Sequence, residues 1–252
     1  MKAFIIARDR VTYARQCVLQ LAARSLDVVV VDHGSTYPEM VEWLDGIGPN
    51  DSEAPRAAWG YPGSTLRVLR RGNAHPRDLW TNGTIAELVA PGERFIVTDC
   101  DVVPDVACPP NWVAVLWQVL NENPWAVKAG LGLRLDGLPS HYEHRDRVRQ
   151  WEAQWWAKTG PMVHGVPLYR AGVDTTLALY RAPEEPFAIV PSLRTGGFYQ
   201  ARHLPWYEDS GAPTAEEVYY RERSTPGVSH WLDPVSYATA AQVAREVTGE
   251  VR

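Results

Sequence analysis

Short apolar runs alternate with longer segments of helical spacing along the first hundred residues of the chain. The run at 27–32 is apolar on both faces, which is typical of a central strand in a parallel sheet. Between the runs, apolar residues recur three or four positions apart and predict helices. The predicted strands are 3–7, 27–32, 66–69 and 95–98, and the predicted helices are 11–24, 38–44 and 79–89. This alternation predicts an α/β fold, a three-layer α/β/α sandwich with a mostly parallel sheet.

The second half of the chain carries the same two patterns with more interruptions. The predicted helices are 112–120, 141–156, one that starts near 214 and 236–247, and the predicted strands are 126–131 and 175–180. The segment 194–209 mixes glycine, aromatic, basic and acidic residues without a clean period, so we expect a loop that carries site residues. Thr214 and Glu217 match a capping box at the start of a helix. Because no repeat or clear linker is present, we expect residues 1–252 to form a single domain.

Polar residues follow the predicted strands of the first half at the points where those strands end. They are Asp9, Asp32, Asn73, Asp99 and Asp101. Taken singly, each is explained as a helix cap or a turn residue. The carboxyl ends of parallel strands meet at one edge of the sheet, where ligands of open α/β folds bind. The five residues together therefore predict a ligand site at that edge.

Asp99 and Asp101 lie one residue apart after the last of these strands. Side chains alternate across a strand, so both carboxylates are expected to point the same way. Two ionised carboxylates that face one space repel each other unless a cation lies between them, and oxygen ligands suit Mg²⁺ or Mn²⁺. The pair predicts a metal site, and the alternative is a strand end followed by an Asp-rich turn.

Composition narrows the function classes. A formal net charge of -5 gives no general basic field for nucleic acid or an anionic membrane, although a local basic groove stays open. The three cysteines include no C-x-x-C pair, which argues against a disulfide framework or a zinc site and favours a reducing cytoplasm. No apolar run is long enough for a signal peptide or a membrane span, so any membrane association is expected to be peripheral. The eleven tryptophans fit either a large aromatic core or platforms that stack on sugars or bases.

The order of these residues resembles the nucleotide-sugar half of a GT-A-fold glycosyltransferase, close to family 2. The resemblance is carried by Asp32 before Gly34-Ser35-Thr36, by Asn73, and by the sequence 98–101, Thr-Asp-Cys-Asp. Four later phrases look similar to a bacterial and phage-type subgroup of these enzymes. They are residues 174–181, residues 201–207, Glu216-Glu217 and Ser229-His230-Trp231.

The resemblance implies a nucleoside diphosphate sugar, most readily a UDP-sugar, as the donor. It makes 1–105 the nucleotide-sugar half and 106–252 the acceptor half with C-terminal helices. A divalent ion, Mn²⁺ or Mg²⁺, would neutralise the diphosphate leaving group. Its direct ligand would be Asp101, while Asp99 would bind either the metal or the donor ribose. Asp32 would accept hydrogen bonds from the nucleobase, and Asp9 or Arg10 would lie beside it. Arg71 and Asn73 would contact the diphosphate or the sugar.

The resemblance leaves the acceptor half open. Many inverting members carry a Glu-Asp pair whose Asp is the catalytic base, and Glu208-Asp209 matches superficially. Asp174 competes, and we prefer it because it begins a strand of the acceptor half, whereas Asp209 can cap the next helix. An inverting enzyme is expected, and a retaining mechanism with neither base stays open.

A late histidine completes the metal sphere in some enzymes of this fold, so His203, or else His230, is a candidate metal ligand. The alternative is that His203 bonds the backbone in a tight aromatic loop. Trp206 and Tyr207 can stack on the acceptor or pack beneath that loop.

The sequence thus predicts a cytoplasmic, metal-dependent glycosyltransferase that moves a sugar to a hydroxyl acceptor, either a glycan or a modified base in phage DNA. A nucleotidyltransferase that makes nucleotide sugars is an alternative, but it would be expected to carry a Gly-rich basic segment after the first strand, and residues 7–10 contain no glycine. A non-catalytic sugar-binding or nucleic-acid-binding module is the other alternative. It predicts no donor turnover and no dependence on Asp101.

Overall fold

The computed structural model covers the whole chain and describes all of it except residues 52, 55–62, 73–74, 174–175, 182–189 and 224–252. Four predictions fall outside the described residues. They concern Asn73, Asp174, His230 and the helix at 236–247.

Four parallel strands form the N-terminal part of the sheet, in the order β4-β2-β1-β5. Their bounds are β1 Lys2–Ala7, β2 Asp27–Asp32, β4 Leu66–Arg70 and β5 Phe95–Asp99, and the two-residue β3, Glu53–Ala54, pairs antiparallel with the edge strand β4. The predicted strands at 3–7, 27–32, 66–69 and 95–98 are confirmed within two residues at each end. Parallel pairing explains why these runs are apolar on both faces, because helices cover both sides.

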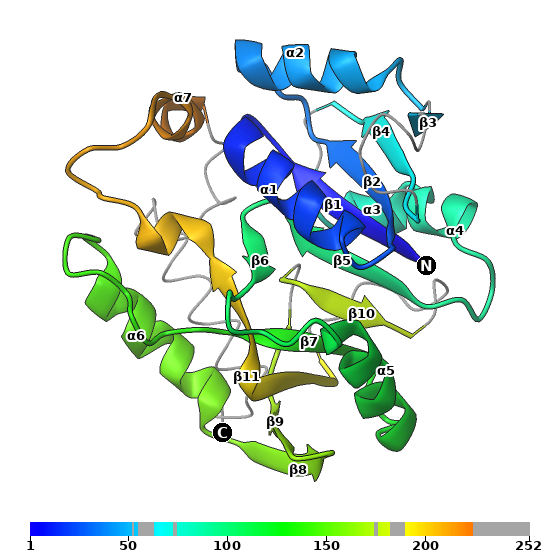
Figure 1. Cartoon of the computed structure of the whole chain (residues 1–252), viewed down its shortest axis with the longest axis vertical. Helices are drawn as coiled ribbons and strands as arrows, with labels where there is room; N and C mark the ends of the chain where they lie inside the picture. Colours follow the sequence, from blue (N-terminus) through cyan, green and yellow to red (C-terminus); the bar gives the residue numbers. More distant parts are fainter. Residues whose placement is uncertain (52, 55–62, 73–74, 174–175, 182–189, 224–252) are drawn as a thin grey trace.

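Helices cover the two faces of this sheet and complete the three layers. On one face lie α1, Val11–Ala22, α2, Pro38–Ile47, and α5, Trp112–Glu122. Ile5 and Val30 point into this core, while their neighbours Phe4 and Val29 point into a second core on the other face. That second core is closed by α3, Asp78–Thr81, and α4, Thr84–Leu88. In Figure 1, α1 crosses in front of β1, and α3 lies behind β2.

The single helix predicted at 79–89 is wrong, because the chain forms two short helices there. Gly83 has a left-handed φ of 80°, a conformation that ends a helix at little cost for glycine. The side-chain oxygen of Asn82 then accepts the backbone N–H of Thr84 at 3.0 Å and starts the second helix.

The second half of the sheet mixes directions. The strand β10, Ala178–Tyr180, lies antiparallel between β5 and β7, Lys128–Leu133. Next to β7 runs β11, Ser192–His203, in parallel, and the hairpin of β9, Val166–Arg170, and β8, Thr159–Val163, forms the far edge. The hairpin was not predicted, although His164 and Gly165 both have positive φ, as a two-residue hairpin turn requires. The sheet as a whole remains the largely parallel centre of a mixed α/β fold.

The loop predicted at 194–209 is wrong. Most of this segment belongs to β11, which is followed by the short 3-10 helix η3, Leu204–Tyr207. The period of two is lost because the register of β11 against β7 shifts between Thr195 and Gln200, where Gly197 has a φ of 63°. After the shift, β11 also pairs with β6, Val102–Pro104, which directly follows the Asp99–Asp101 segment.

Two helices after residue 140 differ in their bounds from those that the sequence pattern indicates. The helix predicted at 141–156 consists of α6, Arg145–Ala153, and the 3-10 turn η2, Gln154–Trp156. The helix predicted near 214 is α7, Ala215–Arg223, and the backbone N–H of Glu217 is bonded to the Thr214 hydroxyl at 3.3 Å. No helix in the described ranges is both long and apolar enough to cross a bilayer.

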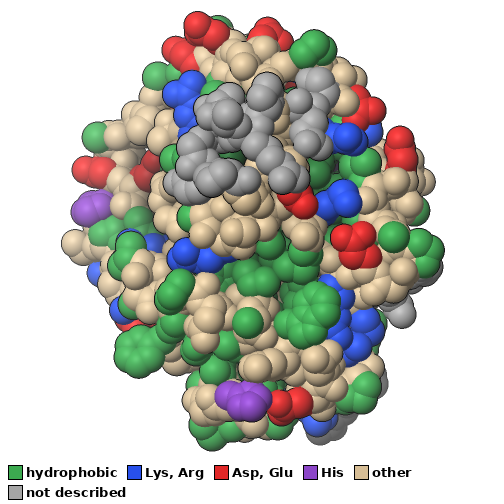
Figure 2. Space-filling model, turned by 45° about the vertical axis from the view of Figure 1, so that its right-hand side comes forward, with side chains coloured by type: hydrophobic (Ala, Val, Ile, Leu, Met, Phe, Trp, Pro, Cys, Tyr) green, Lys and Arg blue, Asp and Glu red, His purple; other side chains and the backbone are tan. Residues whose placement is uncertain are grey.

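The described tryptophans are divided between core and surface. Trp112 and Trp206 are among the largest fully buried side chains. On the surface, Trp117 lies beneath the Arg94 guanidinium at 4.2 Å, and Trp125 lies beneath Arg170 at 4.9 Å. Figure 2 shows one face of the molecule, where hydrophobic side chains gather in the lower half with basic side chains beside them. Packing and arginine stacking therefore account for these four tryptophans without a sugar ligand.

Gly132 of β7 sets how closely β7 and β11 approach. A Cβ at this position would lie 2.5 Å from the carbonyl oxygen of Thr195 and 2.5 Å from the Trp156 ring. We expect Gly132→Ala to lower the free energy of unfolding by about 1–3 kcal/mol, because backbone and ring must both move. Urea unfolding monitored by circular dichroism measures this.

Gly46→Ala in α2 is the matched control. Among the described residues, no atom outside its own helix backbone and its chain neighbours lies within 4 Å of its Cβ position. We expect the change to stabilise the protein by about 0.5–1 kcal/mol through helix propensity. Equal stability of Gly132→Ala and the wild type would contradict the close packing of β7 against β11.

Candidate functional site

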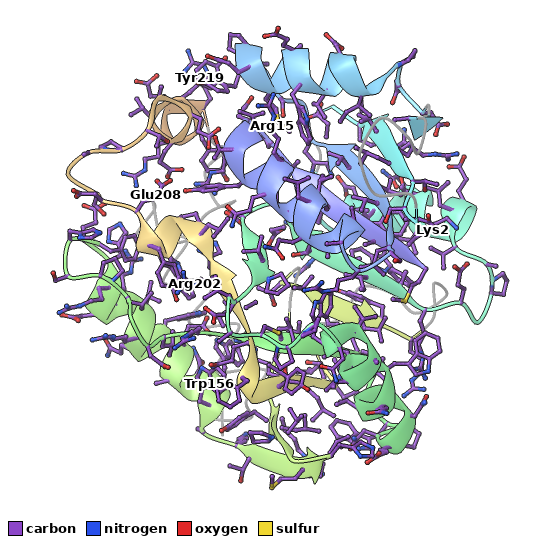
Figure 3. All side chains as sticks on the ribbon, viewed as in Figure 1. Lys2, Arg15, Trp156, Arg202, Glu208 and Tyr219 are labelled. Carbon is purple, nitrogen blue, oxygen red and sulfur yellow. The ribbon has the colours of Figure 1, made fainter. Side chains whose placement is uncertain are left out.

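The candidate site lies at the carboxyl ends of the parallel strands. The loop after β1 carries Asp9 and Arg10, β2 ends at Asp32, and β5 ends at Asp99 just before Asp101. The C-terminal half reaches the same edge through η3 and α7. Figure 3 shows Tyr219 on α7 and Glu208 between η3 and α7, on the side of the molecule where α1 begins.

Arg10 is the centre of the site's charge network. Its Nη1 donates to Oδ2 of Asp101 at 2.6 Å, and its Nη2 donates to Oε2 of Glu217 at 2.8 Å. The Tyr220 ring lies under the guanidinium carbon at 3.8 Å. All three charged residues are buried, with 8% of Arg10, 6% of Asp101 and 2% of Glu217 exposed. Although burial alone lowers the pKa of Arg10, the attraction of Asp101, Tyr220 and Glu217 raises it, so this side chain stays a cation.

Asp99 and Asp101 are not successive positions of one strand. The strand ends at Asp99, and Cys100 and Asp101 form a turn before β6. The argument that strand alternation points both carboxylates the same way is therefore wrong, because alternation stops where the strand stops. Asp101 is buried against Arg10, whereas Asp99 is half-buried.

The pairing of β6 with β11 brings His203 to Asp101. Val102 pairs with His203, and the backbone N–H of Leu204 donates to the carbonyl oxygen of Asp101 at 2.8 Å. Nε2 of His203 lies 3.5 Å from Oδ2 of Asp101. Two of the three predicted metal ligands, Asp101 and His203, are thus neighbours in the fold although they lie 102 positions apart along the chain.

The described residues hold no group of three or more His, Cys, Asp or Glu side chains arranged to bind a metal ion. Asp101 still fits a divalent cation in part, because Arg10 holds its Oδ2 while its Oδ1 has no hydrogen-bond partner among those residues. Asp99 and the His203 imidazole add ligand types that Mn²⁺ accepts. Mg²⁺ and Mn²⁺ sites in nucleotide enzymes commonly use one or two carboxylates and complete the sphere with substrate phosphates and water.

Asp9 and Asp32 brace the loops that border the site. Asp9 has a left-handed φ of 53°, and its Oδ1 accepts the backbone N–H groups of Thr36 at 2.5 Å and Tyr37 at 2.7 Å. Oδ1 of Asp32 accepts the backbone N–H of Ser35 at 3.1 Å. Both residues therefore act as turn residues in this structure, which is the alternative role expected for each. The contact of Asp32 with the nucleobase stays a prediction.

Arg71 borders the same edge from β4. Its backbone N–H donates to the carbonyl oxygen of Asp32 at 2.9 Å, and its Nε lies 3.4 Å from the Thr84 hydroxyl. The side chain is half-buried, so it borders the site without being enclosed by it. Its predicted contact with the diphosphate or sugar stays a prediction.

The two residues of the Glu208-Asp209 pair have different surroundings. Asp209 is exposed, and its Oδ1 accepts the backbone N–H of Gly211 at 2.9 Å within its own turn. Glu208 is half-buried, and its Oε1 accepts a short hydrogen bond from the Tyr13 hydroxyl on α1. Burial and the bond to Glu208 raise the pKa of Tyr13, which keeps the phenol protonated.

Trp206 packs beneath the site. Its ring is 1% exposed and lies 4.7 Å from the His203 ring, between ring centroids. The hydroxyl of Tyr207 donates to the carbonyl oxygen of Arg134 at 3.0 Å. These contacts favour packing over stacking on an acceptor for both aromatic residues.

The sequence reasoning missed how α7 is attached. Oε2 of Glu216 accepts the backbone N–H of Thr12 at 3.0 Å and so caps the start of α1, where no local side chain does. Glu217 bonds Arg10 and Arg221 instead of returning to its own helix start, and the Tyr219 hydroxyl bonds Thr36. Two adjacent acids in a first helical turn were the available signal, but that pattern also describes an ordinary helix start.

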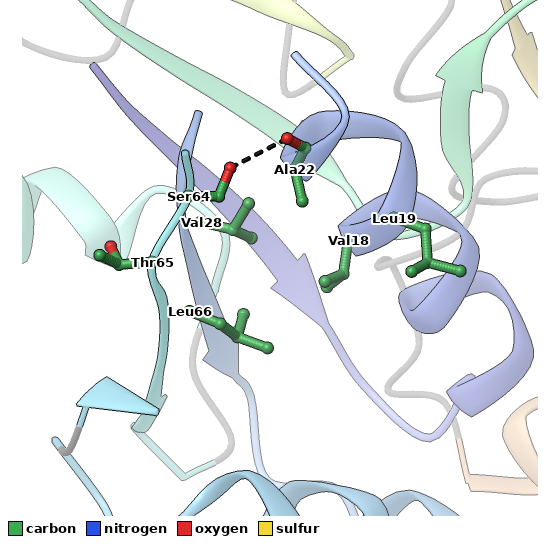
Figure 4. Close-up of a pocket in the computed structure, with 7 residues that line it drawn as sticks. All are labelled: Val18, Leu19, Ala22, Val28, Ser64, Thr65 and Leu66. Atoms are coloured by element: carbon green, nitrogen blue, oxygen red, sulfur yellow. Dashed lines mark hydrogen bonds between the residues drawn. The ribbon is translucent and has the colours of Figure 1, made fainter. Parts of the chain in front are cut away.

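A small cavity lies elsewhere, between α1 and the first residues of β2 and β4 (Figure 4). Its lining is mostly apolar, and the Ser64 hydroxyl on its wall donates to the carbonyl oxygen of Ala22 at 2.9 Å. Val28 and Leu66 lie at the amino-terminal ends of their strands, so the cavity is at the opposite edge of the sheet from Asp101.

Comparison with known proteins gives no family assignment. No protein-family model matches the chain, and no curated protein matches it. Among solved structures, the mannosyltransferase PcManGT from Pyrobaculum calidifontis, in complex with GDP-Man and Mn²⁺, is 15% identical with a TM-score of 0.47, over 88% of this chain and 60% of that chain.

Two further solved structures show a weaker similarity. Glucosyl-3-phosphoglycerate synthase from Mycobacterium tuberculosis, in complex with phosphoglyceric acid, is 13% identical with a TM-score of 0.33, over 73% of this chain and 56% of that chain. UTP-bound UGPase from Acinetobacter baumannii is 12% identical with a TM-score of 0.38, over 95% of this chain and 82% of that chain. Membership of family 2 and of a phage-type subgroup stays a prediction, and function is inferred from the side chains of the site.

Arg10→Met tests the charge network. The change removes the cation that joins Asp101 to Glu217 and leaves Glu217 with Arg221 alone, and we expect the free energy of unfolding to fall by about 3–5 kcal/mol. Arg15→Met, on the exposed side of α1, is the control and should change the free energy of unfolding by less than about 0.5 kcal/mol. Urea unfolding of both variants measures the difference, and equal stabilities would contradict the central role of Arg10.

Glu216→Gln tests the cap on α1 through its pH dependence. Burial raises the pKa of Glu216, so the folded protein favours the neutral acid and loses stability as pH rises through that pKa. Glutamine keeps an oxygen for Thr12 and carries no charge, so the melting temperature of the variant relative to wild type should be higher at about pH 7 than at about pH 4.

Glu222→Gln on the exposed side of α7 is the control for this experiment, and its effect should be small at both pH values. Thermal unfolding across the pH range measures both variants. A stability difference for Glu216→Gln that does not change with pH would contradict the expected titration.

Proposed function

We propose that the protein is a metal-dependent glycosyltransferase that moves a sugar from a nucleoside diphosphate sugar to a hydroxyl acceptor. The observation that carries the proposal is Asp101, which follows β5 at the ligand-binding edge of a parallel sheet. One of its oxygens is held by Arg10, and the other has no hydrogen-bond partner among the described residues. Such a carboxylate is oriented and buried, yet it retains a lone pair for a cation.

The metal would be held by Asp101 and Asp99, with His203 as the third protein ligand. A bound Mn²⁺ or Mg²⁺ supplies positive charge that stabilises the departing diphosphate. Arg10 holds the Asp101 carboxylate in place through its hydrogen bond to Oδ2, and the pairing of β6 with β11 places His203 beside it.

The donor would lie across residues 1–105, and the acceptor would bind to residues 106–252. Asp32 is proposed to bind the nucleobase, with Asp9 and Arg10 shaping the adjoining loop, and Arg71 and Asn73 are proposed to contact the diphosphate or sugar. A UDP-sugar is the proposed donor. The contacts of Asp9 and Asp32 with residues 35–37 support a preformed loop at the base-binding end.

An inverting reaction needs a base opposite the diphosphate, and Asp174 and Asp209 are the sequence-based candidates.

The acceptor is proposed to be a glycan hydroxyl or a modified base in phage DNA. A DNA acceptor predicts binding that weakens steeply as salt rises, since phosphate contacts release counterions. Absence of binding at low salt would favour a glycan or small acceptor.

Donor binding tests the proposed function directly. Wild-type protein is screened by thermal shift against UDP-, GDP-, CMP- and dTDP-sugars, with and without Mn²⁺. A matching donor at a hundred times its dissociation constant should stabilise the protein by about 2.7 kcal/mol. Asp99→Asn should lose the part of this stabilisation that depends on Mn²⁺. The change removes the charge of one proposed metal ligand and leaves the pairing of Arg10 with Asp101 in place.

Asp146→Asn, exposed on α6, is the matched control and should bind donor as the wild type does. Asp101→Ala should abolish Mn²⁺-dependent turnover, with circular dichroism used to check that it remains folded. Turnover that persists in EDTA would contradict the metal dependence, and the absence of a shift with every donor would contradict the proposed function.

A further inference from the structure

We infer that Glu208, positioned by Tyr13, is the base that takes the proton from the acceptor hydroxyl. This role rests on the proposed glycosyl transfer, and it replaces both Asp174 and Asp209 in that step.

Glu208 is held close to Asp101 by the short helix η3. The Leu204 backbone N–H is bonded to the Asp101 carbonyl oxygen, so η3 begins at the proposed metal site. Trp206 then packs on His203, and the helix ends at Tyr207, directly before Glu208. Glu208 is therefore connected to the Asp101 side of the site by packed residues and not by a free loop.

The contact with Tyr13 orients the carboxylate. Tyr13 is a buried residue of the first turns of α1, and its hydroxyl donates to Oε1 of Glu208. The Tyr13 ring also lies 5.7 Å from the Arg10 guanidinium carbon, which places it beside the charge network. Oε2 of Glu208 has no hydrogen-bond partner within the described ranges, so it retains a lone pair that can accept a proton.

Three other described carboxylates near Glu208 in the structure or the sequence already accept hydrogen bonds. Both oxygens of Glu217 accept hydrogen bonds, from Arg10 and from Arg221. Glu216 caps α1 through Thr12. Asp209, which directly follows Glu208 in the chain, is exposed, and its Oδ1 accepts the backbone N–H of Gly211 within its own turn. Glu208 thus combines partial burial, a fixed orientation and an oxygen without a partner.

The proposed step balances as follows. The acceptor oxygen forms a bond to the anomeric carbon of the donor sugar, and the bond from that carbon to the diphosphate oxygen breaks. The electron pair of the broken bond leaves with the nucleoside diphosphate. The proton of the acceptor hydroxyl passes to Oε2 of Glu208 and then to solvent.

Glu208→Gln tests this role without a known acceptor, because water can serve as one. Release of UDP from UDP-glucose, or of GDP from GDP-mannose, is measured with Mn²⁺, and donor affinity is measured by calorimetry. We expect turnover to fall by about 10²–10⁴-fold, the usual contribution of a general base. Donor affinity should stay within about twofold of wild type, since the base acts on the acceptor and not on donor binding.

Three further variants separate a chemical role from a structural one. Glu208→Asp keeps a carboxylate and should recover part of the turnover. Tyr13→Phe removes only the orienting hydroxyl and should lower kcat with little change in the KM for donor. Glu222→Gln is the matched control and should match wild type, because this glutamate is exposed on α7 away from Arg10.

Sodium azide provides a readout that a structural role would not change. Azide attacks without losing a proton, so it should restore nucleoside diphosphate release by Glu208→Gln but not by Asp101→Ala. Full turnover in Glu208→Gln, or loss confined to Asp174→Asn or Asp209→Asn, would overturn the role of Glu208 alone. Failure of wild-type protein to bind or consume either donor would overturn this role together with the proposed function.

Discussion

The buried pairing of Arg10 with Asp101 and Glu217 is the constraint on which the site depends. Two carboxylates lose their hydration when they are buried, and one guanidinium compensates both with bonds of 2.6 and 2.8 Å. Its partners come from a turn after β5 and from α7, so the pairing joins the parallel half of the sheet to the end of the described chain. The Tyr220 ring packs under the Arg10 guanidinium at 3.8 Å and adds a cation–π contact to the same network.

This pairing also holds together the two parts of the chain that we propose to bind the donor and the acceptor. The parallel strands supply Asp101 and the loops of Asp9 and Asp32, whose carboxylates accept backbone N–H groups of residues 35–37. The second half folds back through β11, η3 and α7, each of which is bonded to the first half beside Asp101 or Arg10. A transfer reaction requires two substrates to meet in fixed orientation, and this attachment holds their proposed binding regions together.

Local patterns were sufficient for the N-terminal half of the fold. Apolar runs such as 27–32 predicted parallel strands because burial on both faces leaves a direct signature in the sequence. Local patterns gave a wrong prediction at β11, where a bulge around Gly197 disrupts the alternation of side chains. They were also wrong at 79–89, where Gly83 divides the predicted helix into two. In both places one or two residues with positive φ outweigh the pattern of the segment.

The sequence by itself determined which strand ends carry the acids, because Asp32, Asp99 and Asp101 directly follow apolar runs. It did not determine how those acids are used. Only the tertiary structure decided that Arg10 pairs with Asp101 and Glu217, and that Glu208 rather than Asp209 faces Tyr13. The physical reason is that hydrogen bonds and ion pairs join residues by distance in space, and these partners are separated along the chain by up to about two hundred positions, far beyond the reach of any local pattern.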